Sequence, residues 1–218
     1  MTGDKEIDIW SGYKQAVFDT FPDLQYEYNH ATWQNKKGVK LTADLYSGEY
    51  FLKSRHVDIW DGKHLSIHNN IIYPKTPQVG EEIIPCFGMD LMGFFDKKVI
   101  IVFDFQHPKE NFSLSIPDLP KYEGDIRFFE PGNHFSENIY VAYCTMSEVN
   151  EHLDMFKKYL TKYVDMLELE KPTGTDTSVY KDFDSYMTKL DPVAGYLSGK
   201  FGKDKAQRLV NEFLFTYG

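Results

Sequence analysis

The sequence contains few cysteines and no long apolar run. Its two cysteines, Cys86 and Cys144, lack the paired spacing of a zinc site or a redox motif. No apolar stretch approaches the ~20 residues that a membrane-spanning helix needs, and the first residues do not have the pattern of a secretory signal. We therefore expect a cytoplasmic protein of a reducing compartment that does not bind a membrane.

Positive charge is also scarce. The chain has 24 Lys and Arg residues against 33 Asp and Glu residues, which gives a formal net charge of -9 at pH 7. Binding to a phosphate backbone requires clustered Lys and Arg side chains that displace counterions. We therefore expect no nucleic acid among the partners.

Signatures of several common chemistries are missing. The chain has no G-x-x-x-x-G-K-[ST], no G-x-G-x-x-G and no G-x-S-x-G motif, so a nucleotide or a serine nucleophile has no sequence support. His64 and His68 are four residues apart, but they precede a predicted strand without a third ligand, and we expect no metal site. Cys86 fits a core residue better than a nucleophile.

The patterns that are present predict a compact mixed fold. With 218 residues, 42% of them hydrophobic, the chain can bury one substantial core, and we expect a single domain over residues 1–218. Alternating or apolar runs bounded by turn residues predict strands at 41–46, 50–60, 67–73, 86–94, 99–106 and 138–144. Short links between these runs favour antiparallel pairing.

Helical spacing is found before and after the strands. Trp10, Tyr13, Val17 and Phe21 predict an opening helix that stops at Pro22, and later stripes predict helices over 145–167, 180–190 and around 209–213. The central strands are too apolar to face water on either side, so helices should cover both faces of the sheet. The predicted fold is α+β, a three-layer α/β/α sandwich with a central, mostly antiparallel sheet.

A carboxylate interrupts the apolar strand in "PCFGMDLM" at 85–92. On strict alternation Asp90 shares a face with Gly88, and we expect the glycine to leave room above that face. A carboxylic acid in an apolar core can deliver a proton near neutral pH, because its charged form is destabilised. Alternatively, Asp90 accepts backbone N–H bonds and ties down a loop. Asp104, in "VFDFQ", raises the same question more weakly.

A second carboxylate stands in "KLDPVAGYLSGKFG" at 189–202. Asp191 followed by Pro192 is a typical helix start, with Asp as the N-cap and Pro at the first helical position. From this pattern alone Asp191 is predicted to be a cap.

Four separated motifs carry a resemblance to a known family. In chain order they are "LTADLYSGEYFLKSRH", "PCFGMDLM", "KKVIIVFDFQHP" and "KLDPVAGYLSGKFG". Together they resemble the ferredoxin-dependent bilin reductases, most closely the phage-type branch that synthesises phycoerythrobilin, and the similarity runs from Trp10 to the closing "NEFLFTY". The resemblance implies an α/β/α sandwich that holds biliverdin IXα between the sheet and the C-terminal helices.

The resemblance also implies a chemistry. Members of the family bind no flavin, nicotinamide or metal; reduced [2Fe-2S] ferredoxin supplies single electrons and the protein supplies protons. Asp90 matches the aspartate of the family's "FGxD" motif, and Asp191 matches the aspartate that opens its C-terminal helix. By this resemblance Asp90 serves reduction at the C15=C16 bridge and Asp191 serves the A-ring. The expected product is phycoerythrobilin, formed through 15,16-dihydrobiliverdin.

The same motifs are compatible with other activities. A reductase of the same family could stop at 15,16-dihydrobiliverdin or form another phycobilin, and a bilin carrier would keep the pocket without needing acids in it. Asn69 stands where phycocyanobilin-forming members carry a His, which disfavours that product because Asn cannot donate a proton as imidazolium can.

Substrate contacts follow from the same comparison. For the propionates we expect Arg55, Lys53 and Arg127, since carboxylates suit fixed cationic donors. We also expect Asn69 and Met89 to contact the substrate.

Electron delivery requires a basic face on this acidic chain, because ferredoxins of this kind are acidic. One candidate lies at 157–162 and the other at 200–208, and we favour the second because it follows Asp191 closely in the sequence. The two clusters are Lys157, Lys158 and Lys162, and Lys200, Lys203, Lys205 and Arg208. We expect the protein to act as a monomer.

Overall fold

The computed structural model describes residues 8–77, 82–94, 98–124, 133–190 and 193–216. Within these residues one antiparallel sheet runs in the order of the chain, each strand pairing with the next. Its strands are β1 (Gln25–Gln34), β2 (Lys40–Ser47), β3 (Phe51–Trp60), β4 (Leu65–Pro74), β5 (Cys86–Phe94), β6 (Lys98–Gln106) and β7 (Tyr140–Cys144). The links from β1 to β4 and from β5 to β6 are short, whereas longer segments join β4 to β5 and β6 to β7. Every pair is antiparallel, as the sequence predicts.

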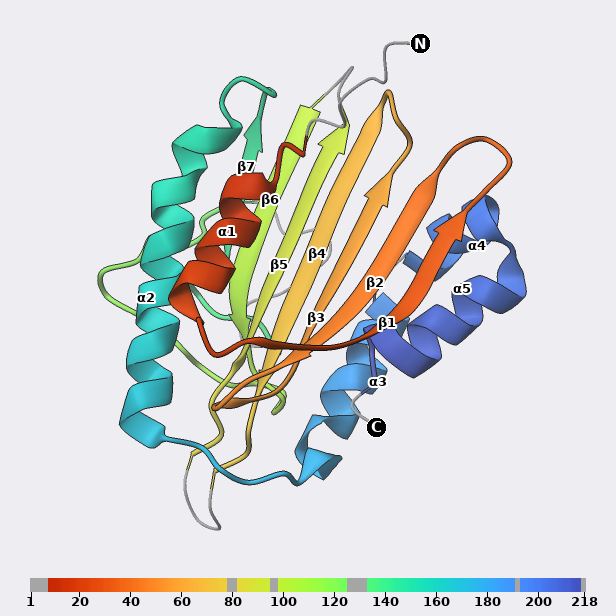
Figure 1. The fold of residues 1–218 in the computed structure, drawn as a ribbon. Coiled ribbons are helices and arrows are strands. Elements are labelled where there is room, and N and C mark those ends of the chain that lie inside the picture. Colours follow the sequence, from red (N-terminus) through yellow and green to blue (C-terminus); the bar gives the residue numbers. More distant parts are fainter. Residues whose placement is uncertain (1–7, 78–81, 95–97, 125–132, 191–192, 217–218) are drawn as a thin grey trace.

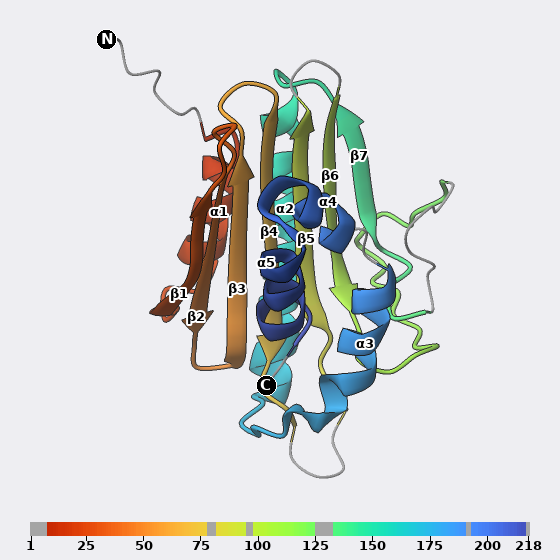
Figure 2. The same cartoon turned by 90° about the vertical axis from the view of Figure 1, so that its right-hand side faces the viewer.

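Helices cover both faces of this sheet (Figures 1 and 2). On one face lie α1 (Ser11–Thr20) and α2 (Leu153–Glu170), which η1 (Val149–His152) precedes. On the other lie η2 (Thr177–Tyr180), α3 (Lys181–Leu190), α4 (Val193–Phe201), α5 (Lys203–Leu209) and the π-helical turn η3 (Val210–Leu214). The three-layer α/β/α sandwich is thus confirmed.

The layer between the sheet and α2 holds the largest core. Alternation on β5 turns Phe87, Met89 and Leu91 towards α2, and each is at most 2% exposed. Phe156 of α2 packs against Phe87 and against Phe103 of β6, with ring centroids 6.0 and 5.2 Å apart. Aromatic pairs at these separations add to the stabilisation from buried area.

The opposite layer contains two smaller apolar clusters. Leu41 and Val57 of the sheet pack with Leu197, Leu209 and Phe213 of the C-terminal helices. Beneath η2 and α3 a second cluster gathers Ile71, Tyr73, Cys86, Tyr180 and Phe183. Cys86 is fully buried there, and burial raises the pKa of its thiol well above the ordinary value. It is a core residue, as the sequence predicts.

The helix boundaries follow the local chemistry. Glu148 accepts hydrogen bonds of 2.8 Å from both the backbone N–H and the hydroxyl of Thr145, which fixes the chain where η1 begins. At the other end Lys171 closes α2 in the left-handed conformation, with φ 44°. The predicted helix over 180–190 is confirmed.

Some features were not predicted. The sequence predicts no strand at 25–34, where the structure has β1, and it places the terminal helix around 209–213, where α5 ends and η3 begins. Across the described ranges, no helix combines the length and the apolar character needed to cross a bilayer.

Candidate active site

A cleft of about 380 Å³ lies between the sheet and the C-terminal helices, and we call it the central cleft. Its floor is the face of β3 to β7 opposite α2, and its roof comes from α3, α4, the end of η3 and the residue after it. Figure 2 shows α3 and α4 over this face of the sheet. The walls are mostly apolar and include Val57, Ile59, Ile67, Ile71, Met92 and Val102 from the sheet. A cleft of this size and character suits a flat, largely apolar ligand.

Three polar side chains cross the floor on adjacent strands. Arg55 of β3 is 3% exposed, and its Nη1 donates a 2.9 Å hydrogen bond to Oδ1 of Asn69 on β4. Asn69 lies directly opposite Asp90 of β5 in the antiparallel register. Side chains opposed in this way have Cβ atoms ~5 Å apart. A cation, an amide and an acid therefore form a row inside an apolar cleft.

Asp90 is partly exposed, because it lines the central cleft. The prediction that it shares a face with Gly88 is confirmed, since both line the cleft, as does Met92. The expectation that the Asp90 carboxylate is fully buried in the core is wrong, because the cleft separates the helical layer from the sheet at this point.

The space above Gly88 is not empty. A Cβ added there would lie 2.5 Å from Nε2, 2.7 Å from Cδ and 2.9 Å from Oε1 of Gln106. The amide of Gln106 therefore lies over the glycine. The prediction that Gly88 leaves open room is wrong, because the end of β6 contributes a side chain that fills it.

Asp104 has a different environment. It is fully buried, and it accepts hydrogen bonds from the hydroxyl of Ser136 and, at 3.0 Å, from the Ser136 backbone N–H. Burial raises the pKa of Asp104 well above its ordinary value, against the effect of these bonds. Its carboxyl ties the segment before β7 to the sheet, which is the structural role that the sequence analysis considered for Asp90.

The predicted substrate-binding residues differ in whether they line the central cleft. Arg55 and Asn69 line the central cleft. Met89 also contributes to its lining, but its side chain is 2% exposed and belongs to the core beneath α2. Arg127 and the predicted acid Asp191 lie outside the described residues; Val193, two positions after Asp191, lines the cleft.

Lys53 makes contacts that differ from the expected ones. Its ammonium donates to the main-chain carbonyl of Phe213 in η3, at 3.5 Å, and to that of Thr216 after η3. The side chain is 9% exposed, and burial, with the nearby Arg55, lowers the pKa of Lys53 to about 8. The structure thus places Lys53 beneath the C-terminal segment, where it stabilises the residues that form one end of the roof.

The two histidines considered for a metal site have different surroundings. His64 follows Asp61 in an exposed turn, whereas His68 is buried and its Nδ1 lies 3.0 Å from Oδ1 of Asp58. Asp58 also pairs with Lys14 at 2.6 Å, and although burial opposes it, these partners lower the pKa of Asp58 to about 2. In the described part of the chain no three His, Cys, Asp or Glu side chains are arranged to hold a metal ion.

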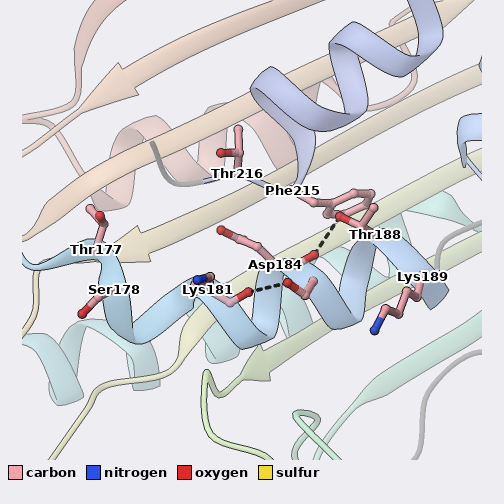
Figure 3. Close-up of a pocket in the computed structure, with 9 residues that line it drawn as sticks. Thr177, Ser178, Lys181, Asp184, Thr188, Lys189, Phe215 and Thr216 are labelled. Carbon is pink, nitrogen blue, oxygen red and sulfur yellow. Dashed lines mark hydrogen bonds between the residues drawn. The ribbon is translucent and has the colours of Figure 1, made fainter.

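A second depression, of about 510 Å³, lies beside α3 and the C-terminal residues Phe215 and Thr216 (Figure 3). Two of its hydroxyls bond within α3, since Ser185 donates to the Lys181 carbonyl and Thr188 to the Asp184 carbonyl. Asp184 accepts a 2.9 Å bond from the Tyr73 hydroxyl. We place the active site in the central cleft because the depression lacks its enclosed apolar walls.

Two cleft residues were missed by the sequence analysis. Gln106 ends β6 opposite Cys86, and this pairing alone does not show that its amide lies over Gly88. Tyr196 lies on α4, across the cleft from the sheet, and burial raises the pKa of its hydroxyl to about 12. Helical spacing alone could not have shown which side of α4 faces the sheet.

The sequence matches the family model described as ferredoxin-dependent bilin reductase over residues 22–216. A 15,16-dihydrobiliverdin:ferredoxin oxidoreductase from Nostoc punctiforme is 28% identical over 214 residues, covering 89% of this chain and 84% of the relative. One from Gloeobacter violaceus is 29% identical, covering 84% and 81%. A phycoerythrobilin:ferredoxin oxidoreductase from Prochlorococcus marinus is 24% identical, covering 88% and 85%.

A solved structure has the same fold. The phytochromobilin synthase from tomato in complex with biliverdin superposes with a TM-score of 0.64 at 17% identity, covering 93% of this chain and 82% of that one. The family model spans most of the chain, including the strands of the cleft floor and the helices of its roof. The chain therefore belongs to the ferredoxin-dependent bilin reductases, enzymes that reduce a bilin with electrons from ferredoxin.

Proposed function

We propose that this enzyme reduces biliverdin IXα to phycoerythrobilin through 15,16-dihydrobiliverdin. The observation that carries the proposal is the carboxyl of Asp90 on the floor of a mostly apolar cleft. Such a cleft suits a flat tetrapyrrole, and an acid on its floor lies against the face of a ligand held between sheet and helices. A carrier would gain nothing from this acid.

Each reduction has a simple balance. Two reduced ferredoxins give up one electron each, two protons are added to the bilin, and one double bond is lost from its conjugated system. Asp90 donates a proton in the first step, at the C15=C16 bridge, and is reprotonated from solvent between turnovers. Asp191, which precedes the α4 residues of the roof, donates in the second step at the A-ring.

Arg55 and Asn69 support this chemistry by position. The 2.9 Å bond between them holds the amide of Asn69 beside Asp90. With Asn in this place no imidazolium is available on the floor as a second donor, which fits an enzyme that does not make phycocyanobilin. The guanidinium of Arg55 supplies a fixed cation for a propionate.

A second candidate is an enzyme that stops at 15,16-dihydrobiliverdin. It is favoured by the names of the relatives from Nostoc punctiforme and Gloeobacter violaceus, which are 28% and 29% identical. The two candidates differ only in whether the A-ring is reduced.

The test is an anaerobic reaction of the purified protein with a ferredoxin-reducing system and, in separate samples, biliverdin or 15,16-dihydrobiliverdin. We expect chromatography to show phycoerythrobilin from both substrates. If 15,16-dihydrobiliverdin accumulates from the first sample and stays unchanged in the second, the two-step proposal is wrong and the second candidate is right.

Asp191→Asn separates the two steps. We expect this variant to convert biliverdin to 15,16-dihydrobiliverdin and to stop there, because Asp90 is intact and the A-ring has lost its donor. Normal phycoerythrobilin formation by Asp191→Asn would leave Asp191 as a helix cap only.

A further inference from the structure

Among the buried polar atoms of cleft-lining residues that have no hydrogen-bond partner in the described part of the chain, two lie on opposite walls of the central cleft. They are Oε1 of Gln106, on the floor, and the hydroxyl oxygen of Tyr196, on the roof. Buried polar groups in folded proteins are almost always paired. Two unpaired atoms that face one cleft therefore indicate that a ligand supplies their partners.

The position of Gln106 depends on Gly88. The amide lies so close over this glycine that a Cβ at 88 would be 2.5 Å from Nε2. Gly88 and Asp90 are two residues apart on one strand face, which separates them by ~7 Å. The amide of Gln106 is thus held beside the acid of the floor, and alanine at position 88 would displace it.

Tyr196 reaches the cleft from the helical layer. It follows Val193 on α4, and both line the cleft, while the next residue, Leu197, is fully buried and fixes the helix against the sheet. Nζ of Lys200 lies 5.4 Å from the centre of the Tyr196 ring. Because the hydroxyl stays protonated at neutral pH, it can donate a hydrogen bond to a ligand oxygen.

We propose that Gln106 and Tyr196 are substrate-binding residues that hold the polar groups of a linear tetrapyrrole from opposite faces of the cleft. The amide oxygen of Gln106 accepts a hydrogen bond from a pyrrole or lactam N–H, and the hydroxyl of Tyr196 donates one to a lactam carbonyl or a propionate. This inference rests on the proposed function, since it takes the occupant of the cleft to be a bilin.

Tyr163 provides a matched control. Its hydroxyl is also buried without a partner in the described part of the chain, but it lies on α2, in the core on the other side of the sheet. Tyr163→Phe and Tyr196→Phe each remove one buried, unpaired hydroxyl. If Tyr196 binds the ligand, only Tyr196→Phe should weaken ligand binding; if the loss of any unpaired hydroxyl matters, both variants should behave alike.

The experiment compares Gln106→Leu, Tyr196→Phe and Tyr163→Phe. Without ligand we expect each to melt at or above the temperature of the wild type, because an unpaired buried polar atom is removed. In absorption titrations with biliverdin we expect Gln106→Leu and Tyr196→Phe to bind about five- to tenfold more weakly, while Tyr163→Phe binds like the wild type. Gly88→Ala should weaken binding as Gln106→Leu does, and Gln106→Glu, which keeps an acceptor, should weaken it less.

The outcomes distinguish this inference from the proposed function. If the wild type binds biliverdin and Gln106→Leu and Tyr196→Phe bind it with unchanged affinity and spectrum, the inference is wrong and the proposed function stands. A melting temperature that falls in both variants, together with unchanged affinity, would give the two residues a structural role instead. If the wild type binds no biliverdin, the proposed function itself fails and the inference fails with it.

Discussion

Asp90 and Asp104 lie on neighbouring strands and differ in what their carboxyl groups contact. Asp90 lines the central cleft, whereas Asp104 is fully buried and bonded to Ser136. Sequence pattern treats the two alike, because each is a single acid within an apolar strand. The two differ because the segment before β7 packs over Asp104, which gives Asp104 a structural role. Asp90 lies in the cleft, where a ligand can reach it.

We expect Asp90→Asn to slow the first reduction about 100-fold or more, because Asn keeps the shape of the side chain but has no transferable proton. Affinity for biliverdin should change little. The measurement is the rate of biliverdin loss under single-turnover conditions with reduced ferredoxin. Asp104→Asn is the matched control and should react at the rate of the wild type; equal rates in all three proteins would remove Asp90 from the mechanism.

Asp104 should also make stability depend on pH. Its pKa is raised in the folded protein, so the folded state holds a proton that the unfolded state releases above pH ~4. The stabilisation is complete below pH ~4 and is lost as pH rises through the folded-state pKa. Between pH 5 and pH 8 we therefore expect the melting temperature to fall less in Asp104→Asn than in the wild type. Parallel pH profiles would show that Asp104 is already ionised in the fold.

The residue scale also shows where prediction from sequence ends. The face of Asp90 could be predicted, because alternation on β5 is strict and the opposite face is uniformly apolar. The contact of Gln106 with Gly88 could not be predicted, because it depends on the conformation of the Gln106 side chain, which reaches over the neighbouring strand. Lys53 and Arg55 are two residues apart on one face of β3, yet one binds main-chain carbonyls and the other lines the cleft.

Among the elements, β1 was missed for a physical reason. It is an edge strand of which only Ala31 is buried, and its pairing with β2 is irregular between Tyr26 and Tyr28. A strand exposed on both faces has no alternation of apolar and polar residues to reveal it. The predictions for β5, β6 and α2 were confirmed because these elements bury long apolar runs or stripes.

The floor strand β3 and the C-terminal segment make a prediction about the propionates. Arg55 lines the cleft, and its Cζ lies 5.4 Å from the centre of the Phe215 ring, whereas Lys53 binds the carbonyls of Phe213 and Thr216. We expect Arg55→Gln to weaken biliverdin binding about tenfold while leaving the binding of biliverdin dimethyl ester nearly unchanged, because the ester lacks the negative charges. Absorption titrations of both ligands measure this difference.

Lys53→Gln is the control for that comparison. It should lower the melting temperature, because the carbonyls of Phe213 and Thr216 lose a charged donor, and it should affect both ligands equally. If Lys53→Gln, and not Arg55→Gln, removes the preference for the free acid, then Lys53 is the propionate partner.

At the scale of the whole molecule, net charge opposes the approach of an acidic ferredoxin, since the chain itself carries -9. A local basic surface must therefore guide docking. Lys203 and Lys205 are exposed on α5, in the same layer as the roof of the cleft, whereas Lys157 and Lys158 are exposed on α2, in the opposite layer (Figure 2). We expect ferredoxin to dock on the layer that covers the cleft, because an electron then has a shorter path to a bilin in the cleft.

We predict that Lys203→Glu combined with Lys205→Glu lowers the ferredoxin-dependent rate several-fold at low ionic strength, with the effect fading as salt screens it. Lys157→Glu combined with Lys158→Glu changes the net charge equally and should have a much smaller effect. Initial rates at a series of salt concentrations measure both, and titration with biliverdin should show no change in affinity. A larger effect from the α2 pair would move the docking surface to the other face.

We propose that the central cleft of this chain reduces a bilin with electrons from ferredoxin and a proton from Asp90. The most direct measurement adds reduced ferredoxin stepwise, without oxygen, to the complex of the protein with biliverdin and records the absorption spectrum after each addition. We predict that bound biliverdin is converted to 15,16-dihydrobiliverdin after two equivalents and to phycoerythrobilin after four, and that the Asp90→Asn complex keeps the spectrum of biliverdin or a radical derived from it. A wild-type spectrum that stays that of biliverdin after excess reduced ferredoxin would contradict the claim.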